Sequence, residues 1–128
     1  MKLTFDVVGM VLMGIPAMVL HECGHILMAK LCGVKVKRVG FCRTGFYTVR
    51  ETGPKWANLS ISLAGPMMNL LLAIALRDVL PVFAFVNLIA ALFNLLPIPQ
   101  SDGRRILRIL VPARPRARAV PRTHVVVK

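Results

Sequence analysis

Residues 5–27 read FDVVGMVLMGIPAMVLHECGHIL, and this segment is the main evidence for the fold class and for a polar site in the chain. Within residues 7–28 the single formally charged side chain belongs to Glu22. A helix needs about 20 apolar residues to cross the hydrocarbon core of a bilayer. We therefore predict a membrane-spanning helix here, and its polar residues His21, Glu22 and His25 need an explanation because polar groups are costly inside a membrane.

Two further apolar segments follow, at residues 57–76 and 79–96. The polar residues within them are all uncharged. The chain has 128 residues, 56% of them hydrophobic, and a mean hydropathy of +0.68, which fits one membrane domain rather than an ordinary soluble one. Buried helices of a soluble bundle are the alternative, but residues 70–76 and 83–93 lack the polar stripe expected of them. The predicted fold class is an all-α integral membrane protein with a core of three transmembrane helices.

The net charge of +12 is concentrated between and after the apolar segments. Residues 30–55 and the segment after Ser101 are strongly basic, whereas the turn at Arg77 and Asp78 is neutral. Basic loops stay in the cytoplasm. We expect a multi-pass protein of the cell membrane with its N-terminus outside and its C-terminus in the cytoplasm. A nucleic-acid partner is not expected, because the basic residues are not interleaved with aromatic ones.

The first basic segment alternates apolar and polar residues over 34–39 and again over 46–49. This period of two is typical of strands, so a small β-hairpin at the membrane surface is predicted after the first helix. Residues 111–128 are rich in Pro, Arg and Ala and are expected to be a disordered basic tail. Residues 1–110 would then form the functional core.

The first apolar segment contains the motif H-E-x-x-H at residues 21–25. Positions i and i+4 share one face of a helix, so the imidazoles of His21 and His25 can reach one metal ion. Glu22 lies beside them and can accept a proton from water. The alternative is a polar contact between helices, with no metal involved.

A catalytic zinc site usually has three protein ligands. His21 lies about 13 Å from Lys30 along a helix, near the cytoplasmic end of its span. Asp102 follows the third span at the same end, and Pro97 and Pro99 would let the chain loop back toward the membrane. Side and depth therefore favour Asp102 as the third ligand. Its alternative role is to cap the N-terminus of a helix over residues 103–110.

Three motifs together resemble the site-2 protease family of intramembrane zinc metallopeptidases. They are the His21–His25 motif, the sequence AGPMMN at residues 64–69, and Asn94-x-x-Pro97-x-x-x-x-Asp102-Gly103. The resemblance implies one Zn²⁺ per chain, held by His21, His25 and Asp102, with Glu22 as catalytic acid and base. It also implies that Asn69 and Asn94 lie near the active site, where they could contact the substrate backbone; the alternative is that they form hydrogen bonds between helices. Arg104 departs from the family pattern, in which a second glycine often follows Asp-Gly.

The expected function is hydrolysis of peptide bonds in or near transmembrane segments of membrane proteins. The expected partners are a membrane-protein substrate, the lipid bilayer, and a regulatory membrane partner or a second copy of the chain. A catalytically silent membrane scaffold that keeps the zinc site is one alternative. A metal transporter is another, although transporters usually need more spans.

Overall fold

The computed structural model describes residues 7–43 and 45–114. Its elements are, in order, α1 (Val7–Leu31), β1 (Val36–Cys42), β2 (Gly45–Arg50), α2 (Lys55–Leu76), α3 (Pro81–Leu95) and α4 (Asp102–Leu110). The expected tail falls mainly on residues 115–128, which lie outside the described residues, so its disorder stays a prediction.

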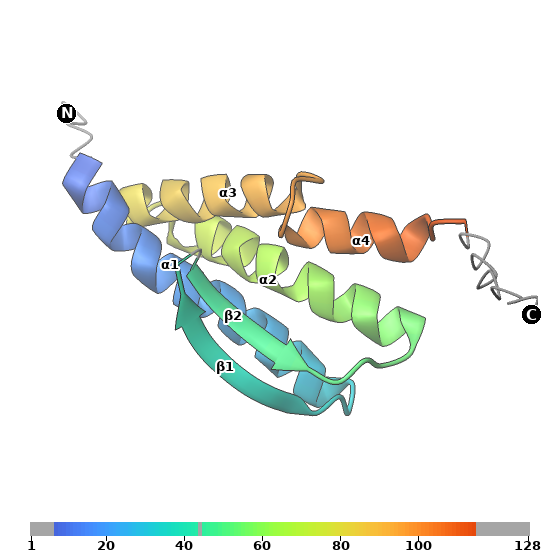
Figure 1. Ribbon diagram of the computed structural model, residues 1–128. Coiled ribbons are helices and arrows are strands. Elements are labelled where there is room, and N and C mark those ends of the chain that lie inside the picture. The colour runs from blue at the N-terminus through green and yellow to red at the C-terminus, as the bar shows by residue number, and fades with distance from the viewer. Residues whose placement is uncertain (1–6, 44, 115–128) are drawn as a thin grey trace, which may run out of the picture.

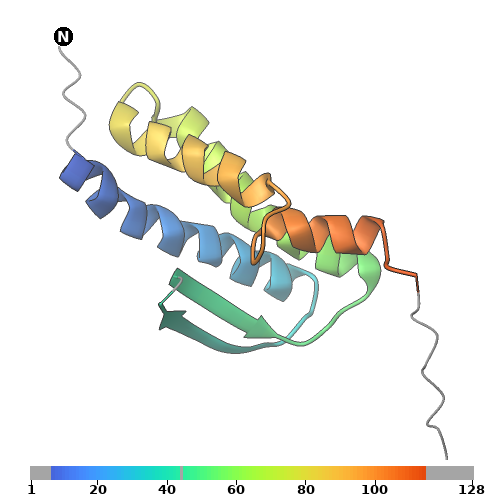
Figure 2. The ribbon, with the colours of Figure 1, turned by 45° about the horizontal axis from the view of Figure 1, so that its top comes forward.

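Helices α1, α2 and α3 pack side by side, and α4 continues beyond the end of α3 against α2 (Figures 1 and 2). The hairpin of β1 and β2 lies along the C-terminal half of α1. The helices approach closely because many of the residues between them are small, including Ala17, Ala29, Ala57, Ala64, Ala73, Ala84 and Ala91, all buried. Helix α2 therefore lies close against both α1 and α3.

The mostly helical fold with a small antiparallel hairpin confirms the coarse prediction, but the third helix is shorter than expected. The predicted segment was 79–96, whereas α3 begins at Pro81 and ends at Leu95. Proline is favoured in the first turn of a helix, and Pro97 prevents continuation. Fifteen residues rise about 22 Å, less than the roughly 30 Å of hydrocarbon. By length and composition, α1 and α2 could cross a membrane, and α3 is a shorter apolar helix.

The strands of the hairpin pair in antiparallel register, with Val39 opposite Thr48 and Gly40 opposite Tyr47. An irregularity separates Val36 from Arg38 on β1. The side chain of Arg50 ties β2 to the start of α2, where its Nη1 donates to Oδ1 of Asn58 at 2.7 Å. This bond fixes the end of β2 against the start of α2.

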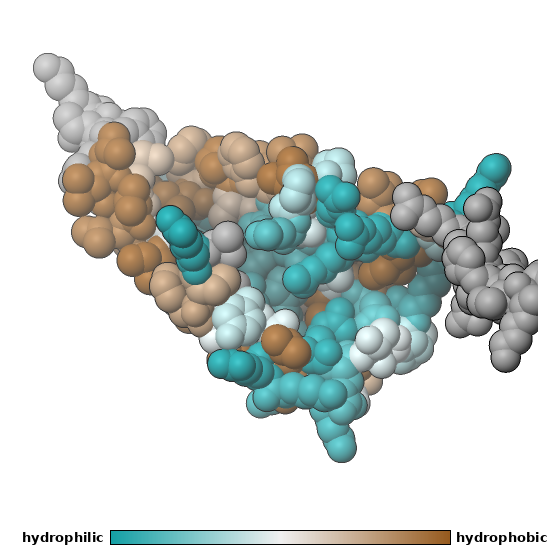
Figure 3. All heavy atoms as spheres, viewed as in Figure 1, coloured by the Kyte–Doolittle hydropathy of each residue, from teal (hydrophilic) through white to brown (hydrophobic). Residues whose placement is uncertain are grey.

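Apolar and polar residues gather at opposite ends of the molecule (Figure 3). The apolar end holds the start of α1 and the turn between α2 and α3, with exposed side chains that include Val7, Val11, Leu71, Ile74 and Val79. The hairpin and α4 form the hydrophilic end. This segregation is the surface expected of a chain placed partly in lipid.

Candidate metal centre

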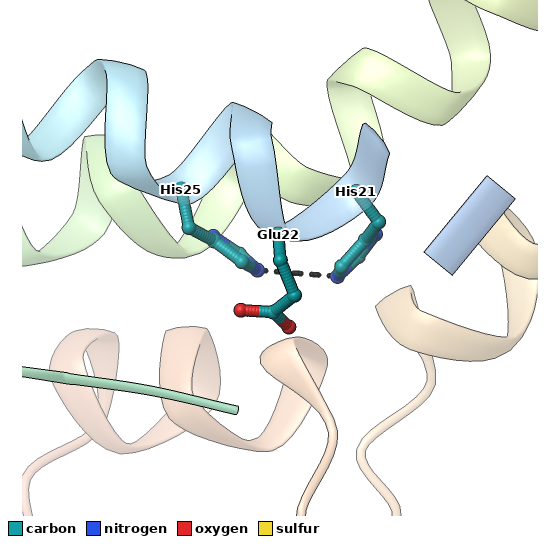
Figure 4. A group of neighbouring side chains, drawn as sticks. All are labelled: His21, Glu22 and His25. Carbon is teal, nitrogen blue, oxygen red and sulfur yellow. Dashed lines mark hydrogen bonds between the residues drawn. The ribbon is translucent and has the colours of Figure 1, made fainter. Parts of the chain in front are cut away.

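His21 and His25 project from the same side of α1, with Glu22 between them (Figure 4). The Nε2 atoms of the two imidazoles are 3.1 Å apart, and both side chains are buried. Their rings meet edge to face, with centroids 4.8 Å apart. The helical spacing therefore does what the motif predicts, because it aims two nitrogen atoms at one point.

Asp102 reaches the same point from α4. Its Oδ2 lies 2.9 Å from Nε2 of His21 and 3.2 Å from Nε2 of His25. The side chain of Asp102 is buried, and Oδ1 of the same carboxylate lies 3.7 Å from the guanidinium of Arg105. Side chains that are 77 and 81 residues apart in sequence thus form one cluster.

The alternative role considered for Asp102, capping the last helix, belongs to Ser101 instead. The Oγ of Ser101 accepts a hydrogen bond from the backbone N–H of Arg104 at 3.2 Å, so Ser101 is the N-cap of α4. Its hydroxyl also contacts the carbonyl oxygens of Leu96 and Ile98, at 2.5 and 2.7 Å. Because Ser101 closes the loop, the carboxylate of Asp102 can turn toward α1. Arg104 donates its backbone N–H normally, so the departure from the family pattern leaves the turn intact.

A cation fits the triangle of Nε2, Nε2 and Oδ2 atoms. His25 donates its Nδ1–H to the carbonyl of Ile61 at 2.6 Å, so its neutral form presents a lone pair at Nε2. A lone pair facing a carboxylate oxygen at 3.2 Å requires a proton or a cation between them. A carbonyl that fixes the second ring nitrogen is also the usual partner of a metal-binding histidine. Two imidazoles and one carboxylate are ligands that suit Zn²⁺.

The charge state of Asp102 also suits a metal. Burial alone would raise the pKa of its carboxyl group, but the neighbouring imidazoles of His21 and His25 outweigh burial and hold that pKa below its usual range. Asp102 is therefore ionised at neutral pH, which is the form that binds a cation.

Gly65 of α2 makes room for the two imidazoles. A Cβ atom at this position would lie 2.7 Å from Nε2 of His21 and would also contact the ring of His25. A side chain at Gly65 would therefore displace both rings. Gly103 has a comparable role at the start of α4, where a Cβ atom would lie 2.6 Å from the carbonyl oxygen of Leu96.

Glu22 lies beside the triangle and has a partner of its own. One oxygen of its carboxylate and one ring nitrogen from each of the two histidines lie within 4.8 Å of one another. The Oγ1 of Thr48, on β2, donates to Oε2 of Glu22 at 2.7 Å. Asp102 contacts both imidazoles directly, and Glu22 lies beside them with Thr48 as its hydrogen-bond partner, so its role in catalysis stays a prediction.

A cavity of about 360 Å³ opens beside these groups. It is lined by residues of all four helices, of β2 and of the loop before α4, including Glu22, Tyr47, Thr48, Asn69, Asn94 and Gln100. Asn69 is fully buried, and neither polar atom of its side chain has a hydrogen-bond partner among the described residues. Asn94 donates its Nδ2 to the carbonyl of Ala90 at 2.9 Å. The structure thus brings both predicted asparagines to the cavity, while their role in binding substrate stays a prediction.

A helix that carries two imidazoles one turn apart, with a glutamate beside them, defines a class of zinc metallopeptidases. The comparisons with known proteins agree with this class. The model of peptidase family M50 matches residues 9–82 and 74–127, and the chain belongs to this family, that of the site-2 proteases.

A curated sequence and a solved structure from Methanocaldococcus jannaschii are both similar to this chain. A zinc metalloprotease of that organism is 32% identical over 108 residues, which are 74% of this chain and 32% of the relative. The solved structure of a site-2 protease superposes with a TM-score of 0.70 at 31% identity, covering 77% of this chain and 52% of the other. The chain thus spans about a third of the curated relative and about half of the solved structure.

Proposed function

We propose that this chain is an intramembrane zinc endopeptidase that hydrolyses peptide bonds in or near transmembrane segments of membrane proteins. The observation that carries the proposal is the triangle of His21, His25 and Asp102 atoms with Glu22 beside it, inside a helix long and apolar enough to cross a membrane. Membership in peptidase family M50 supports the same reaction.

The proposed orientation puts the hairpin and α4 at the cytoplasmic surface. The predicted span ends at Leu27, which is six residues or about 9 Å beyond His21 along the helix, and the basic Lys30 follows it. The site would therefore be within the bilayer but near its cytoplasmic side, and water would reach it through the cavity. The apolar end of the molecule would face lipid, and α3 would span with local thinning of the bilayer.

His21, His25 and Asp102 would hold the zinc ion. When bound, zinc supplies Lewis-acid polarisation of the scissile carbonyl and lowers the pKa of water. Glu22 takes a proton from water in the cavity and returns it to the leaving amine nitrogen. Asn69 has two unpaired polar atoms at the cavity, which suit the amide groups of an unwound substrate backbone.

The substrate must be extended, because the hydrogen bonds of a helix shield its carbonyl groups. Tyr47 and Thr48 of β2 line the cavity, so an extended segment could lie alongside the hairpin and add a strand to it. A regulatory membrane partner or a second copy of the chain would control access. Neither partner is needed for zinc binding in this scheme.

The test is to express the chain together with a panel of membrane-tethered substrates and to follow cleavage products. The parent should cleave, and Glu22→Gln should lose at least the roughly 10²–10⁴-fold that general acid–base catalysis supplies. Zinc content should stay near one per chain in Glu22→Gln, because all three proposed ligands remain. His21→Ala should lose both zinc and cleavage. Equal cleavage by the parent and Glu22→Gln would remove Glu22 from the mechanism, and a zinc-loaded parent that cleaves nothing would favour the silent scaffold.

A further inference from the structure

A direct hydrogen bond joins Thr48 of β2 to Glu22 of α1, the residue proposed as acid and base. The hydroxyl Oγ1 of Thr48 donates to Oε2 of Glu22 at 2.7 Å, and both side chains are half-buried at the wall of the cavity. Hydrogen bonds to a carboxylate are shorter and stronger than those between neutral groups. The bond therefore restricts where the carboxylate can point.

Thr48 is itself held in place from two directions. It pairs with Val39 across the sheet, and two residues further along the same strand Arg50 donates to Asn58 of α2 at 2.7 Å. A threonine in a strand has few accessible χ1 rotamers, because its Cβ atom is branched. The hydroxyl is thus a rigid donor, whereas an unanchored glutamate has several rotatable bonds.

We propose that Thr48 is a positioning residue for Glu22, and this inference rests on the proposed function. The bond occupies Oε2 and leaves Oε1 to take the proton from water, so the carboxylate meets its substrate in one orientation. A misplaced catalytic group loses rate without losing affinity for substrate. A displacement of the hairpin would move the Thr48 hydroxyl away from Glu22 and would slow the reaction as loss of the hydroxyl does.

The kinetic test compares Thr48→Val with Thr48→Ser on a detergent-purified, zinc-loaded chain and a cleavable substrate. Valine keeps the branched shape and removes the donor, so kcat should fall about tenfold or more while KM stays within about twofold; that loss is smaller than the one caused by removing the base. Serine keeps the hydroxyl and should restore most of kcat. Thr52→Val is the matched control, since Thr52 is exposed beyond the end of β2 and should leave kcat unchanged.

A second readout needs no activity. The melting temperatures of the parent, Thr48→Val, Glu22→Ala and the double variant form a double-mutant cycle. Thr48→Val should lower the melting temperature by a few degrees in the parent and by much less when Glu22 is already alanine. Zinc content should be equal in the parent and Thr48→Val, because neither residue is a proposed ligand.

The outcomes separate the two proposals. Additive shifts in the cycle would show that the two side chains do not interact and would overturn the inference. Coupled shifts in melting temperature together with an unchanged kcat in Thr48→Val would also overturn it. So would a low kcat in Thr48→Val that Thr48→Ser shares. A parent that cleaves nothing would overturn the proposed function and the positioning role with it. If the parent cleaves and Thr48→Val cleaves equally well, the positioning role alone is overturned.

Discussion

At the scale of single residues, the space beside the imidazoles depends on Gly65. A Cβ atom there would lie 2.7 Å from Nε2 of His21, which is closer than ordinary packing allows, and the backbone of α2 cannot easily retreat. Gly65→Ala should therefore cost about 1–3 kcal/mol through overpacking at the site. That corresponds to a loss of about 5- to 150-fold in zinc affinity.

Competition with a chelator measures this affinity directly. Gly14→Ala on α1 is the matched control, because a Cβ atom at Gly14 would meet nothing within 4 Å. It should bind zinc as the parent does. Equal affinities in Gly65→Ala and the parent would mean that the imidazoles are not where the site requires them.

The sequence predicts some of these residues and not others. His21 and His25 could be found because the helical period alone puts them on one face. Asp102 could be found because its side and depth matched theirs. Thr48 carried no local signal, and Gly65 was part of the motif at residues 64–69 but was given no role, since the contacts of both residues with α1 are made across elements distant in sequence.

At the scale of elements, the start of α4 carries Asp102 into the site. Ser101 caps this helix and holds the loop after α3 through Leu96 and Ile98. Ser101→Ala should cost about 1 kcal/mol of stability, the usual effect of losing an N-cap. It should also lower zinc affinity by about 10- to 100-fold, as removal of a group that orients a ligand commonly does.

Thermal unfolding and the same chelator competition test both effects. Ser60→Ala is the control, because the Ser60 hydroxyl donates to the carbonyl of Trp56 near the start of α2 and touches none of the site. A Ser101→Ala chain that keeps the parent's zinc affinity would show that Asp102 does not depend on the cap.

The elements themselves follow from the sequence to different degrees. The long apolar helices α1 and α2 and the hairpin could be predicted because apolar length and alternation are local signals. The length of α3 was overestimated because hydropathy does not register that Pro81 favours the start of a helix and Pro97 its end. Capping was considered only as an alternative role of Asp102, and Ser101 is the residue that caps α4; serine and aspartate are both good caps, so tertiary contacts decide between them.

At the scale of the whole molecule, the start of α1 and the turn between α2 and α3 lie at one end, and the hairpin and α4 lie at the other. The described basic residues of the hairpin and α4 belong to the second end, so the positive-inside rule predicts that this end is cytoplasmic. Reporter fusions after Lys55 and after Arg118 should both report the cytoplasm, and a fusion at Asp78 should report the outside. A cytoplasmic signal at Asp78 would reverse the orientation and the proposed route of water.

The central claim is that His21, His25 and Asp102 hold one zinc ion, and X-ray absorption at the zinc edge of the purified chain tests it most directly. The account predicts one zinc per chain with two nitrogen ligands and at least one oxygen ligand at about 2.0–2.2 Å. Asp102→Ala should lose most of this zinc. A spectrum dominated by sulfur ligands at about 2.3 Å, or a purified chain that binds no zinc, would contradict the account.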